Sequence, residues 1–496
     1  MSGGVAAHAA YNGSGTQGLA VTNKVDAEEG DVMSVFWNSN DTTRQLLHGS
    51  SIVEVPSSGA QTLGFRGTRI FTINSDIDCL GDLYLEIGAT LPTYTRATSV
   101  ANIELRYKPY ILQSLIDRVE IMVGTQVWQT IEEEDLRVLN ATELTPDVFE
   151  ECGLQTSVSA AALAGDTVGG GKGRAWIVIP SLTKTLGPAL NRFTGHSIDG
   201  YPMAAAPHQS FKIRVTFRQE FAPTLTNVAS PGMANGSPGG EFSTNEPYIM
   251  GVATNASYGA PDYEILRDGG SDLYTTTATD TPAAITRCNL YAKQIIMCNE
   301  EREHMRGMLL GLPKRLKMSQ NAHTTQVTGR VVTVDLDHFS LFTSHLLITG
   351  FCGHSNQGIT GTLRNARMAS STYIRLASAE LKLNASSYSG VLPGHLLESA
   401  TADSIGIFSN KIVQCGGDDT PLQIEDYGMG TYVFPLASTC YSGSSVPLNR
   451  FDSIRLRLVL SDTPTPSSTA PYFVNVTCVG ETTALFKGGT VSLAMY

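Results

Sequence analysis

The glycine-rich stretch VGGGKGR is the first place where residue types could do chemistry, because glycines before a lysine can cradle a phosphate group. A phosphate-binding loop needs a glycine five positions before its Gly-Lys pair and a serine or threonine after the lysine. Asp166 stands at the first of these positions and Gly173 at the second. We therefore interpret the stretch as a turn and predict no nucleotide site.

Histidines and acidic residues gather in DLDHFSLFTSHLLITGFCGH, and imidazoles with carboxylates are typical metal ligands. In an extended chain, His338 and His345 are seven residues apart and so face opposite sides of a sheet. A cupin-like site would need His-x-His on one face, and EREHM lacks the HExxH spacing of a zinc helix. We predict no metal site, and we interpret the following as ordinary residues of a β domain: Asp335, Asp337, His338, His345 and His354.

Two charged clusters could bind ions or partners. The run Glu132 to Asp135 could hold a cation, but carboxylates are favourable at a helix start and need no ion there. Lys314, Arg315 and Lys317 could contact an acidic partner or lipid headgroups, and we interpret them instead as a solvated joint. No serine, histidine and aspartate set occurs in a nucleophile-elbow context. The sequence thus predicts no catalytic, cofactor-binding or metal-binding residue, and a protein that is not an enzyme.

Composition excludes further classes. The chain has 496 residues, a formal net charge of −12 and 16% charged residues. A protein that packages nucleic acid carries surplus positive charge, so we predict no direct contact with nucleic acid. No apolar run is long enough for a membrane helix, and the N-terminus lacks the pattern of a signal peptide. The eight cysteines are scattered without CxxC pairs, which predicts buried thiols made in a reducing compartment.

The elements that must position these residues form an internal repeat. Several phrases of the first half return in the second half in the same order, which is hard to obtain by chance. We expect Arg69 to superpose on Arg330 and Phe211 on Phe451, and the duplication prediction depends most on these two pairs. The other matched residues are Thr72 with Thr333, Ile73 with Val334, Glu120 with Glu380, Pro180 with Pro435, Pro207 with Pro447 and Cys298 with Cys478.

Short alternating segments predict a β protein. In IRLRLVL, Ile454, Leu456, Leu458 and Leu460 point one way while the arginines point the other, the period of a half-buried strand. With 48 glycines and sparse helical patterns, we predict an all-β chain of two tandem β-sandwiches with long loops and a few short helices, for which two eight-stranded jelly rolls are the leading candidate. One helix is expected in QTIEEEDLRVLNAT, where Thr130 and Glu133 have capping-box spacing.

The expected domain limits follow from the repeat. Residues 1–24 form a flexible arm, 25–305 the first jelly roll and 313–496 the second. A joint at 306–312 connects them, supplied by EREHMRGMLLGLPKRLKM with a break at Pro313. The segment 222–284, rich in proline and glycine, is expected to be a surface loop inside the first jelly roll.

The chain resembles the double jelly-roll major capsid proteins of nucleocytoplasmic large DNA viruses. The resemblance is carried in family order by GTRIFTINSDIDCLGDLYLEIGATLP, LIDRVEIMVGTQVWQT, QIIMCNEEREHM, ELKLNASSYSG, TYVFPLAS with PLNRFDSIRLRL, and GGTVSLAMY. YVFPLASTCYSGSSVPLNRFD departs from the family's Pro-Ser-Gly-rich phrase, and the 222–284 loop is long. An algal, coccolithovirus-like member is one type compatible with these residues.

The resemblance implies a function and partners. It implies a viral structural protein, made in the host cytoplasm and located in the capsid of the virion, that forms homotrimers. These would be pseudo-hexameric capsomers that tile an icosahedral capsid over an internal membrane. Its partners would be itself, neighbouring trimers, minor capsid and penton proteins, and the inner membrane through the N-terminal arm.

Two other classes stay open. The first is a tandem β-sandwich surface protein that binds a receptor or glycan. The second is a carbohydrate-active or cupin-type enzyme. The mass of the purified protein, glycan binding and metal analysis would separate these alternatives from a capsid protein.

Overall fold

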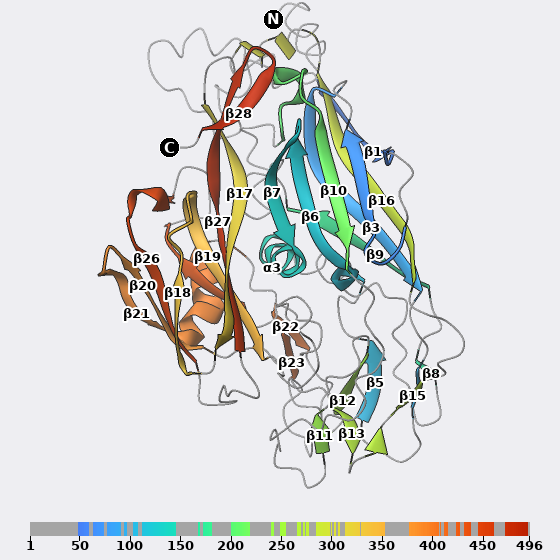
Figure 1. Ribbon diagram of the computed structural model, residues 1–496, viewed down its shortest axis with the longest axis vertical. Helices are drawn as coiled ribbons and strands as arrows, with labels where there is room; N and C mark the ends of the chain where they lie inside the picture. Colours follow the sequence, from blue (N-terminus) through green and yellow to red (C-terminus); the bar gives the residue numbers. More distant parts are fainter. Residues whose placement is uncertain are drawn as a thin grey trace, which may run out of the picture.

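The computed structural model is built almost entirely from antiparallel strands in two side-by-side sandwiches (Figure 1). It describes residues 48–58, 63–73, 77–90, 94–96, 103–107, 112–144, 167–168, 172–180, 200–218, 240–242, 249–253, 265–268, 271–272, 274–276, 284–297, 299, 302–303, 306–307, 313–327, 329–352, 376–405, 407, 411–414, 423–426, 431–437, 445–460 and 472–494. The predicted arm at 1–24 and the joint at 306–312 lie almost wholly outside these residues.

The first sandwich has two four-stranded sheets. One has the order β1-β16-β3-β9 and the other the order β2-β10-β6-β7. When only the eight strands of these two sheets are numbered in chain order, the sheets have the orders 1-8-3-6 and 2-7-4-5, which is the arrangement of a jelly roll. The bounds are β1 (His48–Val55), β2 (Thr68–Ile73), β3 (Cys79–Thr90), β6 (Ile116–Val123), β7 (Gln126–Glu132), β9 (Lys172–Ile179), β10 (Phe211–Phe217) and β16 (Ala284–Met297).

The second sandwich repeats this order strand for strand. Its sheets run β17-β27-β19-β24 and β18-β26-β20-β21, again strands 1-8-3-6 and 2-7-4-5. The fold is therefore all-β with two eight-stranded jelly rolls, as predicted. The bounds are β17 (Pro313–Val327), β18 (Val331–Asp335), β19 (Phe342–Cys352), β20 (Leu376–Leu383), β21 (Ser386–Pro393), β24 (Tyr432–Pro435), β26 (Ile454–Leu460) and β27 (Tyr472–Lys487), with β25 (Val446–Pro447) and β28 (Thr490–Ala494) added at the edges.

Alternating side chains explain why these strands form sandwiches. In β10 every second residue from Phe211 to Phe217 is buried, and in β26 the same holds from Ile454 to Leu460. The arginines of these strands lie on the outer face. Each fully buried Leu, Ile, Val or Phe contributes about 1.5–3 kcal/mol relative to leaving it exposed, so the inner faces hold the sheets together.

The register of the strand ladders tests the repeat residue by residue. Val123 and Leu383 end β6 and β20, and each is followed by a two-residue turn. Glu120 with Glu380 is therefore a correct match. Val123 pairs with Phe211, however, whereas Leu383 pairs with Ile454. Phe211 thus corresponds to Ile454.

The predicted match of Phe211 with Phe451 is wrong by three residues. The second copy has three more residues than the first between its proline, Pro447, and its strand, so that Phe451 lies in the loop before β26. It is half-buried there, against the core.

The match of Arg69 with Arg330 is also wrong. Arg69 pairs with Val215, whose counterpart Leu458 pairs with Val332, so the register is shifted by two residues. The shift of two applies equally to Thr72 and Ile73. A shift of two keeps every side chain on the same face, which is why residue identity alone could not reveal it.

The second pair of sheets gives the same correction. The match found for β2 and β18 extends to β3 and β19. Arg69 corresponds to Val332, and the same number of residues leads from Arg69 to Leu83 as from Val332 to Leu346, so Leu83 corresponds to Leu346. Leu83 pairs with Ile179 and Leu346 with Phe434, which agrees with the predicted match of Pro180 with Pro435. The partners on the other side are Ala292 and Cys478, so Cys478 does not match Cys298, which lies outside the described residues. The duplication is therefore supported by strand order and not by the two pairs on which the prediction most depended.

Loop segments pair with one another at one end of the first jelly roll (Figure 1). Parts of the predicted 222–284 loop form short strands that pair with the β3–β6 connection, through β12 with β5 and β15 with β4. The bounds are β4 (Tyr94–Arg96), β5 (Ile103–Tyr107), β8 (Thr167–Val168), β11 (Gly240–Phe242), β12 (Ile249–Ala253), β13 (Ile265–Asp268), β14 (Ser271–Asp272), β15 (Tyr274–Thr276) and, in the second jelly roll, β22 (Lys411–Gln414) and β23 (Gln423–Asp426).

Helices are short, as predicted. The helix expected in QTIEEEDLRVLNAT is α3 (Glu133–Glu143), but the capping box is not formed. Thr130 belongs to β7, and the residue before the helix is Glu132, whose side chain makes no capping hydrogen bond. The other helical turns are η2 (Gln113–Leu115), η4 (Met203–Ala205), η6 (Leu396–Ala400), α7 (Thr401–Ile405) and η7 (Leu448–Arg450).

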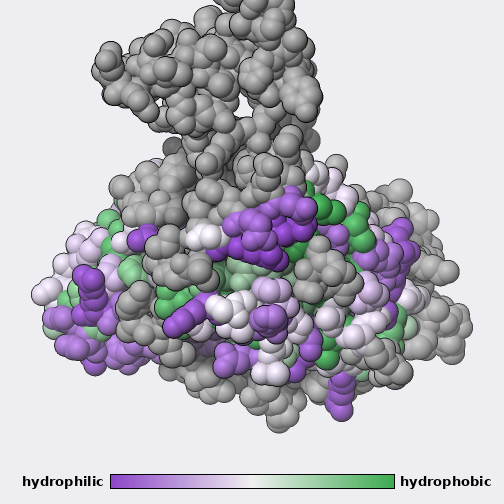
Figure 2. All heavy atoms as spheres, turned by 90° about the horizontal axis from the view of Figure 1, so that it is seen from above, coloured by the Kyte–Doolittle hydropathy of each residue, from purple (hydrophilic) through white to green (hydrophobic). Residues whose placement is uncertain are grey.

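Seen from above, the described residues alternate between hydrophilic and hydrophobic in small groups (Figure 2). Within the described ranges, no helix has both the length and the apolar character to span a bilayer.

Cys79, Cys288 and Cys478 are buried free thiols, and burial raises the pKa of the last two to about 12, which keeps them protonated and unreactive at neutral pH.

Candidate functional site: the interface between the jelly rolls

Of the histidines and carboxylates singled out in the sequence, those within the described residues do not converge on a metal, and His354 lies outside these residues. His338 contacts the carbonyl oxygen of Asn321 at 3.0 Å, and His345 is buried in β19 beside Ser344. Asp337 accepts the backbone N–H of Ile454 and so holds the start of β26. In the part of the chain that is described, no three His, Cys, Asp or Glu side chains are grouped as metal ligands. The absence of a catalytic or cofactor site stays a prediction.

The buried polar residues concentrate instead where the two jelly rolls meet. Helix α3 and strand β7 of the first jelly roll lie against the outer face of the second, formed by β17, β27 and β19 (Figure 1). Along these three strands one set of alternate residues points into the second core. The other set points at α3 and β7, and it is polar: Lys317, Ser319, Asn321, His323, Thr349, Asn475 and Thr477.

Asp135 is the centre of this interface. Its side chain accepts hydrogen bonds from Asn321 at 2.7 Å, Asn475 at 3.0 Å and the Thr477 hydroxyl at 2.7 Å. Asp135 is 2% exposed, so water does not compete for these oxygens. Three donors from two strands of the second jelly roll thus satisfy one carboxylate of the first.

Further polar contacts flank Asp135. Glu134 accepts a hydrogen bond from Thr349 at 2.8 Å, and Gln129 donates to Ser319 at 2.9 Å. The ammonium group of Lys317 forms an ion pair with Glu143. These contacts fix the distance and the register between the jelly rolls, because each needs its partner within hydrogen-bond reach.

Nearby charges and burial determine the electrostatic environment of two side chains near the interface, Glu133 and His345. Glu133 turns back into its own jelly roll, where Arg137 and Arg218 lie 3.4 Å and 3.5 Å from its carboxylate. His345 is fully enclosed, and burial together with nearby Lys317 lowers its pKa to about 3. The imidazole is therefore neutral at pH 7.

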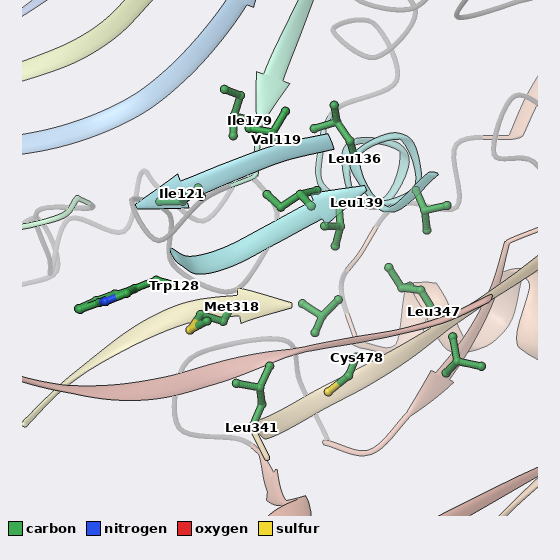
Figure 3. Close-up of a cluster of buried hydrophobic side chains, with 14 of the residues drawn as sticks. Val119, Ile121, Trp128, Leu136, Leu139, Ile179, Met318, Leu341, Leu347 and Cys478 are labelled. Carbon is green, nitrogen blue, oxygen red and sulfur yellow. The ribbon is translucent and has the colours of Figure 1, made fainter. Parts of the chain in front are cut away.

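Apolar side chains join the two jelly rolls beside the polar contacts. Figure 3 shows Trp128, Leu136 and Leu139 of the first jelly roll in one cluster with Leu347, which lies on the outer face of β19. Met318 and Cys478 of the same cluster belong to the alternate set that points into the second core. All six are buried members of one continuous core cluster. The burial of this apolar area supplies stability, and the polar residues supply the unique orientation.

The β27–β28 hairpin forms a second bridge. The backbone N–H of His208 donates to the Gly489 carbonyl at 3.1 Å, and the N–H of Val491 donates to the Gln209 side chain at 2.8 Å. Phe486 is buried and packs against Tyr201 of the first jelly roll, with ring centroids 6.2 Å apart. The two sandwiches are thus held at both α3 and the hairpin.

Two interpretations from the sequence are wrong here. Lys317 does not belong to a solvated joint, because the chain from Pro313 onward is strand β17 and Lys317 is buried. The acidic run after Glu132 does start a helix, but Glu134 and Asp135 bind the second jelly roll. In VNVTC, the alternation of Asn475 and Thr477 with apolar residues indicates that β27 has a polar outer face, but it does not reveal what covers that face.

The comparisons with known proteins give a structural match only. No protein-family model matches the sequence, and no curated protein matches it. Among solved structures, a chain of the PBCV-1 virus capsid is 13% identical with a TM-score of 0.53, covering 94% of this chain and 99% of that one. The Faustovirus major capsid protein is 9% identical with a TM-score of 0.54, covering 92% and 93%. At these identities the likeness establishes the fold, a double jelly roll as in these capsid proteins.

Proposed function

We propose that this protein is the major capsid protein of a large DNA virus and that it acts as a structural subunit, not as an enzyme. The observation that carries the proposal is the extent of the likeness: both jelly rolls and their connections align over 94% of this chain with 99% of a PBCV-1 capsid chain. A binding module grafted on one sandwich would not require the second sandwich in a fixed orientation.

The fixed interface supports a role in assembly. Two similar sandwiches locked side by side give one chain two nearly equivalent edges, so that three chains around a threefold axis form a six-sided block. We propose such a homotrimer as the capsomer. Contacts between neighbouring trimers can each be weak, since many act together in a closed shell.

The remaining partners follow from the same proposal. The shell is an icosahedral capsid over an internal membrane, completed by minor capsid and penton proteins. The protein is made in the host cytoplasm and resides in the virion. The arm at residues 1–24 contacts the membrane or minor proteins, and no residue contacts nucleic acid, in keeping with the net charge of −12. The domain limits 25–305 and 313–496 are part of this proposal.

Light scattering of the purified protein is the direct test. The proposal predicts a particle of about three times 53.0 kDa. Removal of residues 1–19 should leave that mass unchanged and impair only the assembly of shells. A monomer that binds glycans would favour the alternative of a surface-binding protein, and loss of the trimer on truncation would contradict the separate role of the arm.

A further inference from the structure

Helix α3 has a counterpart in the second jelly roll. In the first, the side chain of Asn140 donates to the carbonyl oxygen of Val178 at 2.9 Å. In the second, the hydroxyl of Thr401 donates to the carbonyl oxygen of Val433 at 2.7 Å. Val178 and Val433 are equivalent by ladder register, since they pair with Tyr84 and Leu347 in the equivalent strands β3 and β19. The η6–α7 segment therefore occupies in the second jelly roll the place of α3 in the first.

The two helical segments differ in what covers them. The outer residues of α3 and the end of β7 are buried by the second jelly roll, as Asp135 shows. The corresponding elements of the second jelly roll, β21 and η6–α7, carry exposed side chains. Val391 is 58% exposed and Tyr388 is 43% exposed, and His395 is exposed at the start of η6. Among the described residues, strand β21 is also the edge of its sheet, with β20 as its neighbour.

The covered sheet face has a counterpart as well. Ladder register matches Ser319 with Ile52, Thr477 with Tyr291 and Leu347 with Tyr84, so the outer face of β1, β16 and β3 corresponds to the outer face of β17, β27 and β19. In the second jelly roll this face is buried under α3. In the first, Ile52 is 62% exposed, and Tyr84 and Tyr291 are half-buried.

The chemistry of this face fits a protein partner. Trp176 and Tyr291 pack against each other with ring centroids 5.1 Å apart, and Glu86 beneath them is neutralised by Arg287 and Arg174. Aromatic and arginine side chains around an exposed isoleucine are typical of interface centres. In the polar interface within the chain, the equivalent positions bear Ser319 and Thr477.

We propose that the outer face of β1, β16 and β3 of one copy binds β21 and the η6–α7 segment of a second copy. The contact repeats between chains the packing that α3 and β7 make within the chain. It is heterologous, because one copy contributes its first jelly roll and the other its second, and such contacts form a ring when the rotation between successive copies closes, as a threefold rotation does. The inference rests on the proposed capsomer and names the surfaces that form it.

Matched substitutions of exposed aliphatic residues by aspartate test the assignment. Val391→Asp and Ile52→Asp place a charge in the proposed contact, whereas Val331→Asp places the same charge on β18 at a residue that is 53% exposed and outside it. Burial of an unpaired charge at an interface centre raises the dissociation constant by about 100-fold or more. We expect both contact variants to be monomers by light scattering and Val331→Asp to form the wild-type assembly.

Controls distinguish a variant that misfolds from a wrong assignment of the surfaces and from a wrong proposed function. Circular dichroism and hydrogen exchange of β6 and β27 should show that each variant keeps its folded core, and exchange at β1 and β21 should be slower in the wild-type assembly than in the Val391→Asp monomer. Trimers of both contact variants, with a wild-type trimer, would overturn the assigned surfaces and leave the proposed function intact. A monomeric wild type would overturn the proposed function itself.

Discussion

Replacing Asp135 by alanine should loosen the two jelly rolls without unfolding either core. The substitution removes the acceptor of three hydrogen bonds and leaves the donors of Asn321, Asn475 and Thr477 buried. Each hydrogen bond to a charged group contributes about 1.5–3 kcal/mol, and part of this sum is offset because the buried carboxylate no longer has to be desolvated. We expect a net loss of about 3–5 kcal/mol in the free energy of opening this interface.

Native-state hydrogen exchange measures this quantity locally, which matters because a chain of two domains need not unfold in one step. A loss of about 3 kcal/mol corresponds to exchange that is more than about 100-fold faster at α3 and β27. Amides of β10, which β6 separates from β7 within the same sheet, should keep their wild-type rates. Glu303→Ala is the control, because its carboxylate is 70% exposed and pairs with Arg306 at the surface.

A double-mutant cycle isolates the contact itself. Thr477→Val removes one donor with little change in shape, so the effects of this substitution and of Asp135→Ala should not add. We expect a coupling energy of about 1–2 kcal/mol. Exchange at α3 and β27 within threefold of wild type in Asp135→Ala, or a coupling energy near zero, would refute the assignment of Asp135 as the centre of the interface.

Three other predictions concern stability. Because the pKa of His345 is lowered to about 3 in the folded protein from its ordinary 6.5, the unfolded chain binds more protons between these values, and stability falls as pH falls through that window. His345→Gln should reduce the slope of the free energy of unfolding against pH, measured by urea denaturation, by up to about 1.4 kcal/mol per pH unit. Gly480→Ala would bring a Cβ within 2.4 Å of the Phe342 carbonyl oxygen and should cost at least about 2 kcal/mol, whereas Gly329→Ala, which has open space, should lower the melting temperature far less. Ala385 has a φ of 66° in the β20–β21 turn, so Ala385→Gly should raise the melting temperature by relieving about 1 kcal/mol of strain, and an unchanged temperature would contradict this.

The fold was predictable from the sequence because a sandwich strand carries its own signal. The alternation in Ile454–Leu460 assigns both the strand and its buried face, and the turn after Leu383 marks the hairpin. The exact register of the repeat was not predictable. Shifts of two residues leave the inner and outer faces unchanged, and the matched prolines Pro207 and Pro447 are followed by connections of different length before their strands.

The interface was not predictable because it depends on tertiary neighbours. The residues that bind across it, such as Asp135 and Lys317, are charged, and charged residues are usually at the surface. Local reasoning assigned them to a helix start and a solvated joint. Only the packing of α3 on β17 and β27 shows that each has a partner on the other jelly roll.

Electron microscopy of the purified protein tests the central claim most directly, because it shows both the number of chains and their arrangement. If two locked jelly rolls per chain build the capsomer, class averages should show a six-sided particle with threefold symmetry and six similar lobes. Particles with two lobes, or rings with any other symmetry, would contradict the account.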